Sequence, residues 1–237
     1  MKNQQYSHIK RKVGEYTISY GVIQSIHDSC DTIDFFKISD LKYGFYLADV
    51  AGPGKNSITT MNKLQQLINK NCFECLENKQ ECIFNPSLIA KTINTEMYTN
   101  NLNKYVTLIY GILDLSTNII EYTTAGYYPN PIFVTNDLKP KNAKYLFSKG
   151  FPLGILPDAN FENFQIKMEK NNSMVFFSDG IMSFFKPDSN NSKNKDDELL
   201  KLILNANVDI SNILENLNLN YSIPIVDDIV ILTLQRT

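Results

Sequence analysis

Alternating and helical patterns of apolar residues divide the first half of the chain into strands followed by helices. Apolar and polar residues alternate over 16–22, and strand-like apolar segments follow at 33–38 and 43–50. The period then changes to steps of three and four residues, which is typical of amphipathic helices. Two such segments are present, at 57–75 and 86–99.

The second half of the chain repeats this order of strands before helices. Further strand patterns lie at 106–115, 119–124, 131–134, 164–168 and 174–178. Two helical patterns and a closing strand complete the chain, at 198–204, 210–217 and 229–234. Strands and helices that cluster in this way, without regular alternation, favour an α+β domain with antiparallel sheets. We expect a polar tail over 1–13 and one domain over 14–237, with a sheet completed from both ends of the chain.

Composition excludes several classes of protein. The 237 residues carry a formal charge of −2 and only two arginines, so we expect no binding of nucleic acid. No stretch of 18 apolar residues is present, and the polar start lacks the apolar segment of a secretory signal. These features predict a cytoplasmic protein without a membrane span. Two histidines are too few for a His-rich zinc site, so any catalytic metal must be held mainly by oxygen or sulfur.

Four aspartates lie at the ends of predicted strands, where loops can present them. They are Asp34, Asp49, Asp179 and Asp227. Each borders an apolar strand, so its charge is costly to bury unless it is paired or binds a metal. Converging carboxylates repel one another, and a hard divalent cation such as Mg²⁺ or Mn²⁺ would remove that repulsion. Aspartate is also common in turns for structural reasons, so no single one of the four identifies a site.

The motifs around these aspartates follow one another in the order of a known family. They are Asp34-Phe-Phe, Ala48-Asp-Val-Ala-Gly-Pro-Gly54, Tyr105–Asp114 with Tyr122–Gly126, Gly150–Pro157 with Phe176–Gly180, and Asp227-Asp-Ile-Val-Ile-Leu232. From Gly14 to Leu234 the chain resembles the SpoIIE/RsbU-type branch of PPM (PP2C-like) serine/threonine phosphatases. The resemblance implies an α-β-β-α sandwich, in which two packed antiparallel sheets are flanked by pairs of helices.

The same resemblance implies a binuclear metal site and a hydrolytic reaction. Asp49 would bridge two Mn²⁺ or Mg²⁺ ions, and Asp34 and the backbone carbonyl of Val50 would hold one of them. Asp179 and Asp227 would complete the other. With both ions bound, the site would supply an activated water for attack on the phosphorus of a phosphoserine or phosphothreonine. No nucleophilic cysteine or serine is then needed.

The chain departs from the family pattern at several positions around the expected site. Thr32 and Ile33 stand where the family has two glycines, and Pro53 replaces a histidine. Thr124 and Tyr127 replace an asparagine and a histidine beside the Ala-Gly pair. Side chains in place of glycine would crowd the approach to the metals. These departures leave open a second hypothesis, a catalytically weak or dead phosphatase fold that acts as a binding or regulatory module.

Family resemblance also implies a partner and a mode of control. The typical substrate is a phosphorylated STAS-domain anti-anti-sigma factor in a bacterial partner-switching circuit. About thirteen residues precede the family pattern, so we expect control by an activator in trans or by self-association. The helices at 57–75 and 86–99 are our candidate switch element, because the first begins directly after the expected metal-binding turn. The polar segment over 186–197 is expected to be a solvated loop.

A P-loop is the first of two alternatives that the motifs raise. Gly54 and Lys55 follow an apolar strand, as the end of a P-loop does. That motif also needs a glycine five positions earlier and a serine or threonine after the lysine. Those positions hold Asp49 and Asn56, so the pattern fails at both and we disfavour the P-loop.

A cysteine-based zinc or redox site is the second alternative. Cys72, Cys75 and Cys82 lie close together in the sequence. The first two fall on the apolar stripe of a predicted helix, where cysteine packs as a small hydrophobic residue. We therefore favour core positions for these cysteines. His27 is interpreted as a surface or turn residue, since hard ions are satisfied by oxygen ligands.

Overall fold

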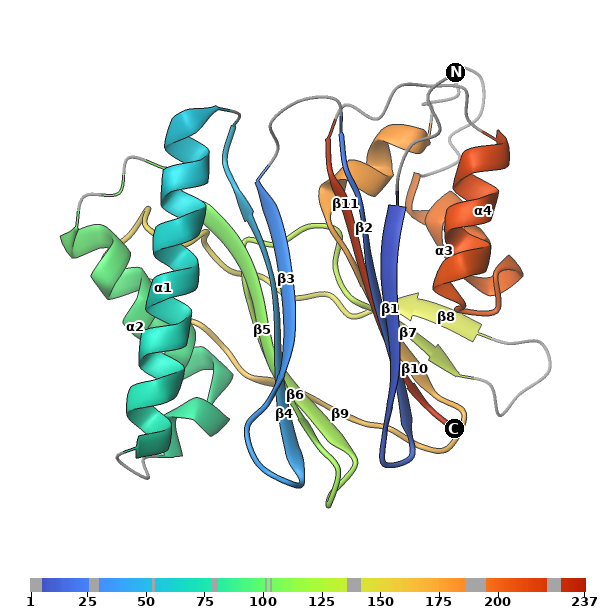
Figure 1. Ribbon diagram of the computed structural model, residues 1–237, viewed down its shortest axis with the longest axis horizontal. Helices are drawn as coiled ribbons and strands as arrows, with labels where there is room; N and C mark the ends of the chain where they lie inside the picture. The colour runs from blue at the N-terminus through green and yellow to red at the C-terminus, as the bar shows by residue number, and fades with distance from the viewer. Residues whose placement is uncertain are drawn as a thin grey trace. The chain divides into compact units, whose positions relative to one another are not determined.

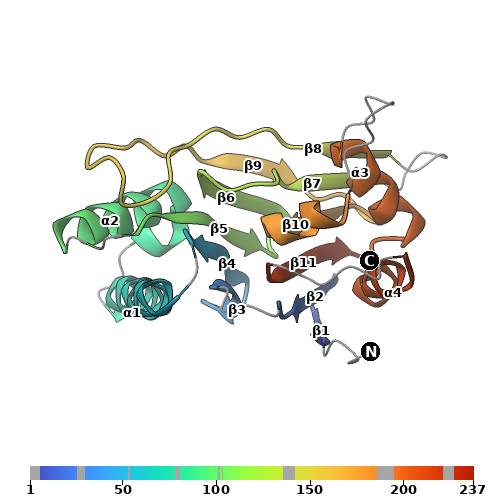
Figure 2. The ribbon, with the colours of Figure 1, turned by 90° about the horizontal axis from the view of Figure 1, so that it is seen from above.

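The computed structural model describes most of the chain, and the described residues form two compact units. The described ranges are 6–25, 30–52, 54–77, 81–100, 102, 104–135, 142–185, 195–220 and 227–237. Unit 1 comprises Met1–His27, Pro129–Phe147 and Glu169–Thr237, and unit 2 comprises Asp28–Tyr128 and Ser148–Met168. Each unit contains an antiparallel sheet with two α-helices on one face (Figures 1 and 2). The predicted α+β class is confirmed.

The sheet of unit 2 has five strands in the order β3-β4-β5-β6-β9. Their bounds are β3 Asp31–Lys37, β4 Lys42–Val50, β5 Val106–Asp114, β6 Ile119–Ala125 and β9 Phe164–Lys167. Strands β5 and β6, which follow each other in the sequence, pair as an antiparallel hairpin. Asp114 stabilises its turn, because one carboxylate oxygen accepts the backbone N–H groups of Ser116 at 2.8 Å and Thr117 at 3.3 Å.

Helices α1 (Lys55–Glu77) and α2 (Pro86–Thr99) lie beside each other on one face of this sheet, with the short helix η1 (Glu81–Phe84) between them in sequence (Figure 1). Asn85 caps α2 by accepting the N–H of Leu88 at 3.2 Å, and Pro86 occupies the first turn, where no N–H is needed. The core of the unit joins both helices to β4 and β5. It includes Leu64, Ile68, Ile89, Ile93, Tyr46, Ala48, Val50 and Leu108.

The sheet of unit 1 has six strands in the order β1-β2-β11-β10-β7-β8. Their bounds are β1 Tyr6–Val13, β2 Tyr16–Ile23, β7 Ile132–Thr135, β8 Asn142–Tyr145, β10 Ser173–Phe177 and β11 Ile229–Arg236. Strand β11 pairs with β2 along its whole length, which confirms a sheet completed from both ends of the chain. Residues 6–13 form β1 instead of the expected tail. This strand is at the sheet edge and largely exposed, so its sequence carries little apolar signal.

Helices α3 (Lys195–Asn205) and α4 (Ile210–Asn220) cover one face of this sheet, α3 beside β8 and α4 beside β2 (Figure 2). The short helix η2 (Asp179–Phe184) follows β10. Buried residues of these helices pack with the sheet in one core, among them Leu199, Ile203, Ile213, Leu217, Val175, Ile229 and Ile231. Most of the expected loop at 186–197 lies outside the described residues, and its last three residues begin α3.

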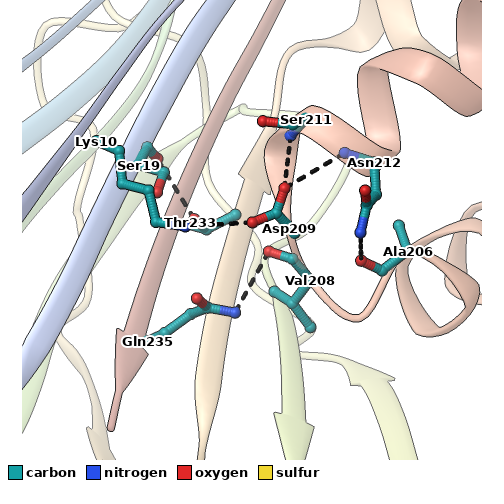
Figure 3. A network of polar contacts seen from close by, with 9 residues as sticks. All are labelled: Lys10, Ser19, Ala206, Val208, Asp209, Ser211, Asn212, Thr233 and Gln235. Carbon is teal, nitrogen blue, oxygen red and sulfur yellow. Dashed lines mark hydrogen bonds and ion pairs between the residues drawn. The ribbon is translucent and has the colours of Figure 1, made fainter.

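Polar contacts hold the connection between α3 and α4 against the sheet (Figure 3). Asp209 caps α4, because its Oδ1 accepts the N–H groups of Ser211 at 2.9 Å and Asn212 at 3.3 Å. Its other oxygen forms an ion pair of 3.3 Å with Lys10 of β1. Gln235 of β11 donates to the carbonyl of the residue before Asp209 at 3.3 Å. The connection is therefore joined to the edge and to the middle of the sheet.

Helix length and polarity bear on the prediction that no segment spans a membrane. Helix α1, with 23 residues, is the longest of the described helices. Among the residues that the structure describes, no helix combines the length and the apolar character that a membrane span requires.

Candidate metal centre

The turn between β4 and α1 follows Asp49 and Val50, the last two residues of β4, and is held by its neighbours in unit 2. Gly52 has a φ of +74°, a conformation that residues with a side chain rarely adopt. The hydroxyl of Ser57, a buried residue of α1, donates to the Gly52 carbonyl. The N–H of Ala51 donates to the carbonyl of Tyr105 at 3.1 Å. Both contacts hold the backbone after Asp49 in one conformation.

The register of β3 against β4 places Asp31 beside Asp49. These residues lie directly across from each other, whereas Asp34 lies across from Tyr46. Since side chains alternate between the two faces of a sheet, Asp31 and Asp49 share one face and Asp34 is on the other. Both carboxylate oxygens of Asp31 are buried. Like charges directly opposite one another destabilise a sheet, and a divalent cation at this position would relieve the repulsion.

Asp34 lies on the face of the sheet that α1 and α2 cover, together with Tyr46 of the unit 2 core. Its Oδ1 accepts the N–H of Phe35 at 2.7 Å. Burial and, second, the negative charge of Asp34 raise the pKa of Tyr46 to about 12. Asp31 is not among the four aspartates that the sequence motifs predicted. The two-residue period of a strand was the available signal, because residues three apart face opposite sides.

In unit 1, Asp179 and Asp227 lie at the same end of two paired strands. Strand β10 ends at Phe177, across from Ile231 of β11, and Asp179 follows within two residues. Asp227 precedes the first residue of β11 by two positions. Desolvation and, second, the negative charge of Asp227 raise the pKa of Asp179, although part of that residue stays exposed. The structure therefore brings this predicted pair together within its unit.

The backbone around this pair is closely packed. A Cβ built on Gly180 would lie 2.1 Å from the carbonyl oxygen of Asp228, so only glycine fits there. The hydroxyl of Ser178 donates to the same carbonyl at 3.0 Å and accepts an N–H from β11. The carboxylate of Asp228 accepts the N–H of Ser25 at 2.6 Å. Asp228 is thus a structural residue that holds the start of β11, and its neighbour Asp227 is the candidate ligand.

The candidate ligands are divided between the units, with Asp31 and Asp49 in unit 2 and Asp179 and Asp227 in unit 1. Within the described residues, no group of three or more His, Cys, Asp or Glu side chains that could hold a metal ion is present. Each pair on its own has the oxygen donors that Mg²⁺ and Mn²⁺ prefer, so the residues fit the expected ions. A joint site of both pairs stays a prediction. Pro53 and His27, which the sequence singled out, lie outside the described residues.

Cys72 is a core residue, as its position on the apolar stripe of the helix predicted. It is buried in the core of unit 2, and its sulfur lies 3.6 Å from the hydroxyl of Tyr110. Burial raises the pKa of the Cys72 thiol, which leaves it in the protonated form. The side chains of Cys75 and Cys82 are outside the described part of the chain.

Solved structures identify the class of fold. The RsbU and RsbW domains of Rv1364c from Mycobacterium tuberculosis have a TM-score of 0.71 and 18% identity, over 98% of this chain and 59% of that one. The PP2C phosphatase domain of SpoIIE from Bacillus subtilis, solved with a fragment of its regulatory domain, has a TM-score of 0.66 and 16% identity, over 99% of this chain and 72% of that one. RsbX, in a structure with magnesium, has a TM-score of 0.63 and 16% identity, over 98% and 100%. The fold is that of the PP2C-like phosphatase domains.

The sequence identifies the family within that class. Residues 39–237 match the family described as Stage II sporulation protein E (SpoIIE), and the chain belongs to this family. Phosphoserine phosphatase RsbU of Bacillus subtilis is 26% identical over 137 residues, which cover 57% of this chain and 37% of RsbU. Phosphoserine phosphatase RsbP of the same organism is 21% identical over 159 residues, which cover 65% of this chain and 36% of RsbP. The chain thus spans about a third of the length of these relatives.

Proposed function

We propose that the chain is a metal-dependent phosphatase that hydrolyses phosphoserine or phosphothreonine on a signalling protein. The observation that carries the proposal is the position of Asp31 directly across from Asp49, at the turn into α1. Membership of the SpoIIE family supports it, as do the names of RsbU and RsbP. Two ions, Mn²⁺ or Mg²⁺, would be held by Asp31, Asp49, the carbonyl of Val50, Asp179 and Asp227.

The chain's own residues would position the ligands before any ion binds. Asp31 and Asp49 belong to paired strands, which hold two carboxylates on one face of a sheet. Ser57 holds the turn that carries the Val50 carbonyl, and Gly180 allows Asp179 to lie beside Asp227. When bound, the ions supply an activated water and offset the negative charge of the phosphoryl group.

Asp31 replaces Asp34 in this proposal as the partner of Asp49. With Asp31 as the ligand, the two glycine positions of the family shift by three residues along the chain. The two glycine positions of the family then correspond to Ser29 and Cys30, the residues that precede Asp31. Thr32 and Ile33 are no longer at those positions, so they are not expected to crowd the metals.

We propose a phosphorylated STAS-domain protein as the substrate, with control by an activator in trans or by self-association. The names of RsbU and RsbP specify phosphoserine phosphatases. In the Mycobacterium tuberculosis protein, an RsbU domain and an RsbW domain occur together. These relatives support a signalling role, in which the helices α1 and α2 are the candidate switch element, since α1 begins directly after the turn at Asp49.

Hydrolysis of p-nitrophenyl phosphate tests the function and the choice between the two aspartates. The wild type should be active with Mn²⁺ or Mg²⁺ and inactive with EDTA. Asp31→Asn and Asp49→Asn should each lower kcat by about 100-fold or more, because each removes a metal ligand. The matched variant Asp34→Asn should stay within about threefold of the wild type, since its side chain is on the other face.

The variants are compared only after circular dichroism shows that each has the wild-type secondary structure. Loss of activity in Asp34→Asn with retention in Asp31→Asn would overturn the assignment of Asp31. No hydrolysis with any metal would overturn the phosphatase proposal and favour the binding or regulatory module.

A further inference from the structure

The start of β5 brings a lysine to the turn that follows Asp49. Strands β4 and β5 are paired to the last residue of β4, and the N–H of Ala51 donates to the carbonyl of Tyr105 at 3.1 Å. The residue before Tyr105 must therefore lie beside the turn. A Cβ built on Gly52 would lie 3.0 Å from the Nζ of Lys104, so the ammonium group is directly over this glycine.

The charge of Lys104 is available for an anion from outside the unit. In the described part of the chain Lys104 forms no ion pair, whereas Lys37, Lys42 and Lys70 of the same unit each pair with a carboxylate. Lys104 is half-buried and Gly52 is exposed. A half-buried lysine can cover part of its stem and still keep its charged head in contact with water, here beside an exposed backbone.

Neither arginine of the chain is placed to bind an anion at a candidate metal ligand of its own unit. Phosphate is usually bound by the two-pronged guanidinium of arginine, and unit 2 contains no arginine. In unit 1, Arg236 is the last residue of the eight-residue β11, about 23 Å along the strand from the end at Asp227. It pairs with Glu15 at 2.7 Å, and Arg11 lies 5.4 Å from the ring centre of Tyr20.

We infer that Lys104 binds the phosphoryl group of the substrate at the turn after Asp49. The inference rests on the proposed function and adds to it a residue that contacts substrate. Gly52 is two residues from Val50, the proposed carbonyl ligand, and its missing side chain leaves room for the Lys104 ammonium at the turn. A phosphate ester at this turn gains a charge-assisted hydrogen bond from the ammonium group. The contact is made with the bound substrate as well as in the transition state, so it acts mainly on KM.

Steady-state kinetics with p-nitrophenyl phosphate test the inference, with inorganic phosphate as a competitive inhibitor. Lys104→Ala should raise KM and the inhibition constant of phosphate by about tenfold, since a hydrogen bond to a charged group is lost. The kcat and the metal concentration for half-maximal activity should change much less. Lys104→Arg should restore most of the affinity. The control Lys91→Ala, which removes an exposed lysine on α2, should behave as the wild type.

A second measurement does not depend on turnover. With Mg²⁺ present, inorganic phosphate should raise the melting temperature of the wild type and of Lys91→Ala, but not of Lys104→Ala. If the wild type hydrolyses substrate and Lys104→Ala matches Lys91→Ala in both measurements, the role of Lys104 is overturned and the phosphatase stands. If no metal supports hydrolysis, the proposed function fails. The inference then holds only if phosphate stabilises the wild type and Lys91→Ala alone, and it fails if phosphate stabilises all three proteins or none.

Discussion

The backbone of Asp228 passes so close to Gly180 that one added carbon atom changes the structure around Asp179. A Cβ on Gly180 would approach the Asp228 carbonyl to 2.1 Å, and the neighbouring Asp227 carbonyl to 3.2 Å. Both contacts are with backbone, which cannot move aside as the end of a flexible side chain can. The position of Asp179 beside Asp227 therefore depends on a residue that does not itself bind metal.

Gly180→Ala should lower the free energy of unfolding by about 1–3 kcal/mol, because the strands must separate to admit the methyl group. It should also lower phosphatase activity by displacing Asp179. Chemical denaturation and p-nitrophenyl phosphate hydrolysis measure the two effects. Ser183→Ala, an exposed position in the same short helix, serves as control and should change stability by no more than about 1 kcal/mol. Equal stability of the two variants would contradict the prediction.

At the scale of elements, the connection between α3 and α4 depends on one charged cap. Burial alone would raise the pKa of Asp209, but the N–H of Asn212, the ammonium of Lys10 and the N–H of Ser211 together lower it below its usual value of 3.8. A carboxyl with a lowered pKa in the folded state stabilises the protein above its unfolded pKa. That stability is lost as the pH falls through the lower, folded pKa.

Asp209→Asn should therefore destabilise the protein at neutral pH by about 1 kcal/mol or less, since asparagine still caps a helix but lacks the charge. The difference from the wild type should shrink as the pH falls from 5 to below about 3. Urea denaturation at several pH values measures it. Asp40→Asn is a suitable control, because Asp40 has an exposed ion pair with Lys37 and caps no helix. A difference for Asp209→Asn that is constant across this pH range would count against the charged cap.

Most elements could be predicted from the period of the apolar residues. The helices expected at 57–75 and 86–99 are α1 and α2, with α1 two residues longer at each end. Strands β1 and β8 were missed, because both are edge strands with little buried apolar surface. The pattern of apolar and polar residues indicates which residues are buried. An edge strand is stabilised largely by backbone hydrogen bonds, so this pattern predicts it poorly.

At the scale of the whole molecule, each unit contributes one pair of candidate ligands. Metal binding by both pairs would stabilise the folded chain in proportion to the logarithm of the metal concentration. At about 100 times the dissociation constant, the gain is about 2.7 kcal/mol, or about 5–10 °C in melting temperature for a chain of this size.

Mn²⁺ should therefore raise the melting temperature of the wild type, and EDTA should reverse the rise. Asp49→Asn in unit 2 and Asp179→Asn in unit 1 should each abolish most of it, because each pair would then lack a ligand. Differential scanning calorimetry with and without metal measures the shift. Asp34→Asn is the matched control and should keep the full shift. A rise that survives in either ligand variant would show that the two pairs do not bind metal together.

The sequence alone predicted the class of fold, the order of most elements and three of the four aspartates that we propose as ligands. It did so because apolar periodicity and short motifs are local properties of the chain. Only the tertiary structure decided that Asp31 lies across from Asp49, that Lys104 reaches Gly52 and that Gly180 meets the backbone of Asp228. Each of these contacts joins segments that are separate in the sequence. Strand register and the close approach of backbones determine these contacts. Neither can be predicted from the apolar pattern of a single segment.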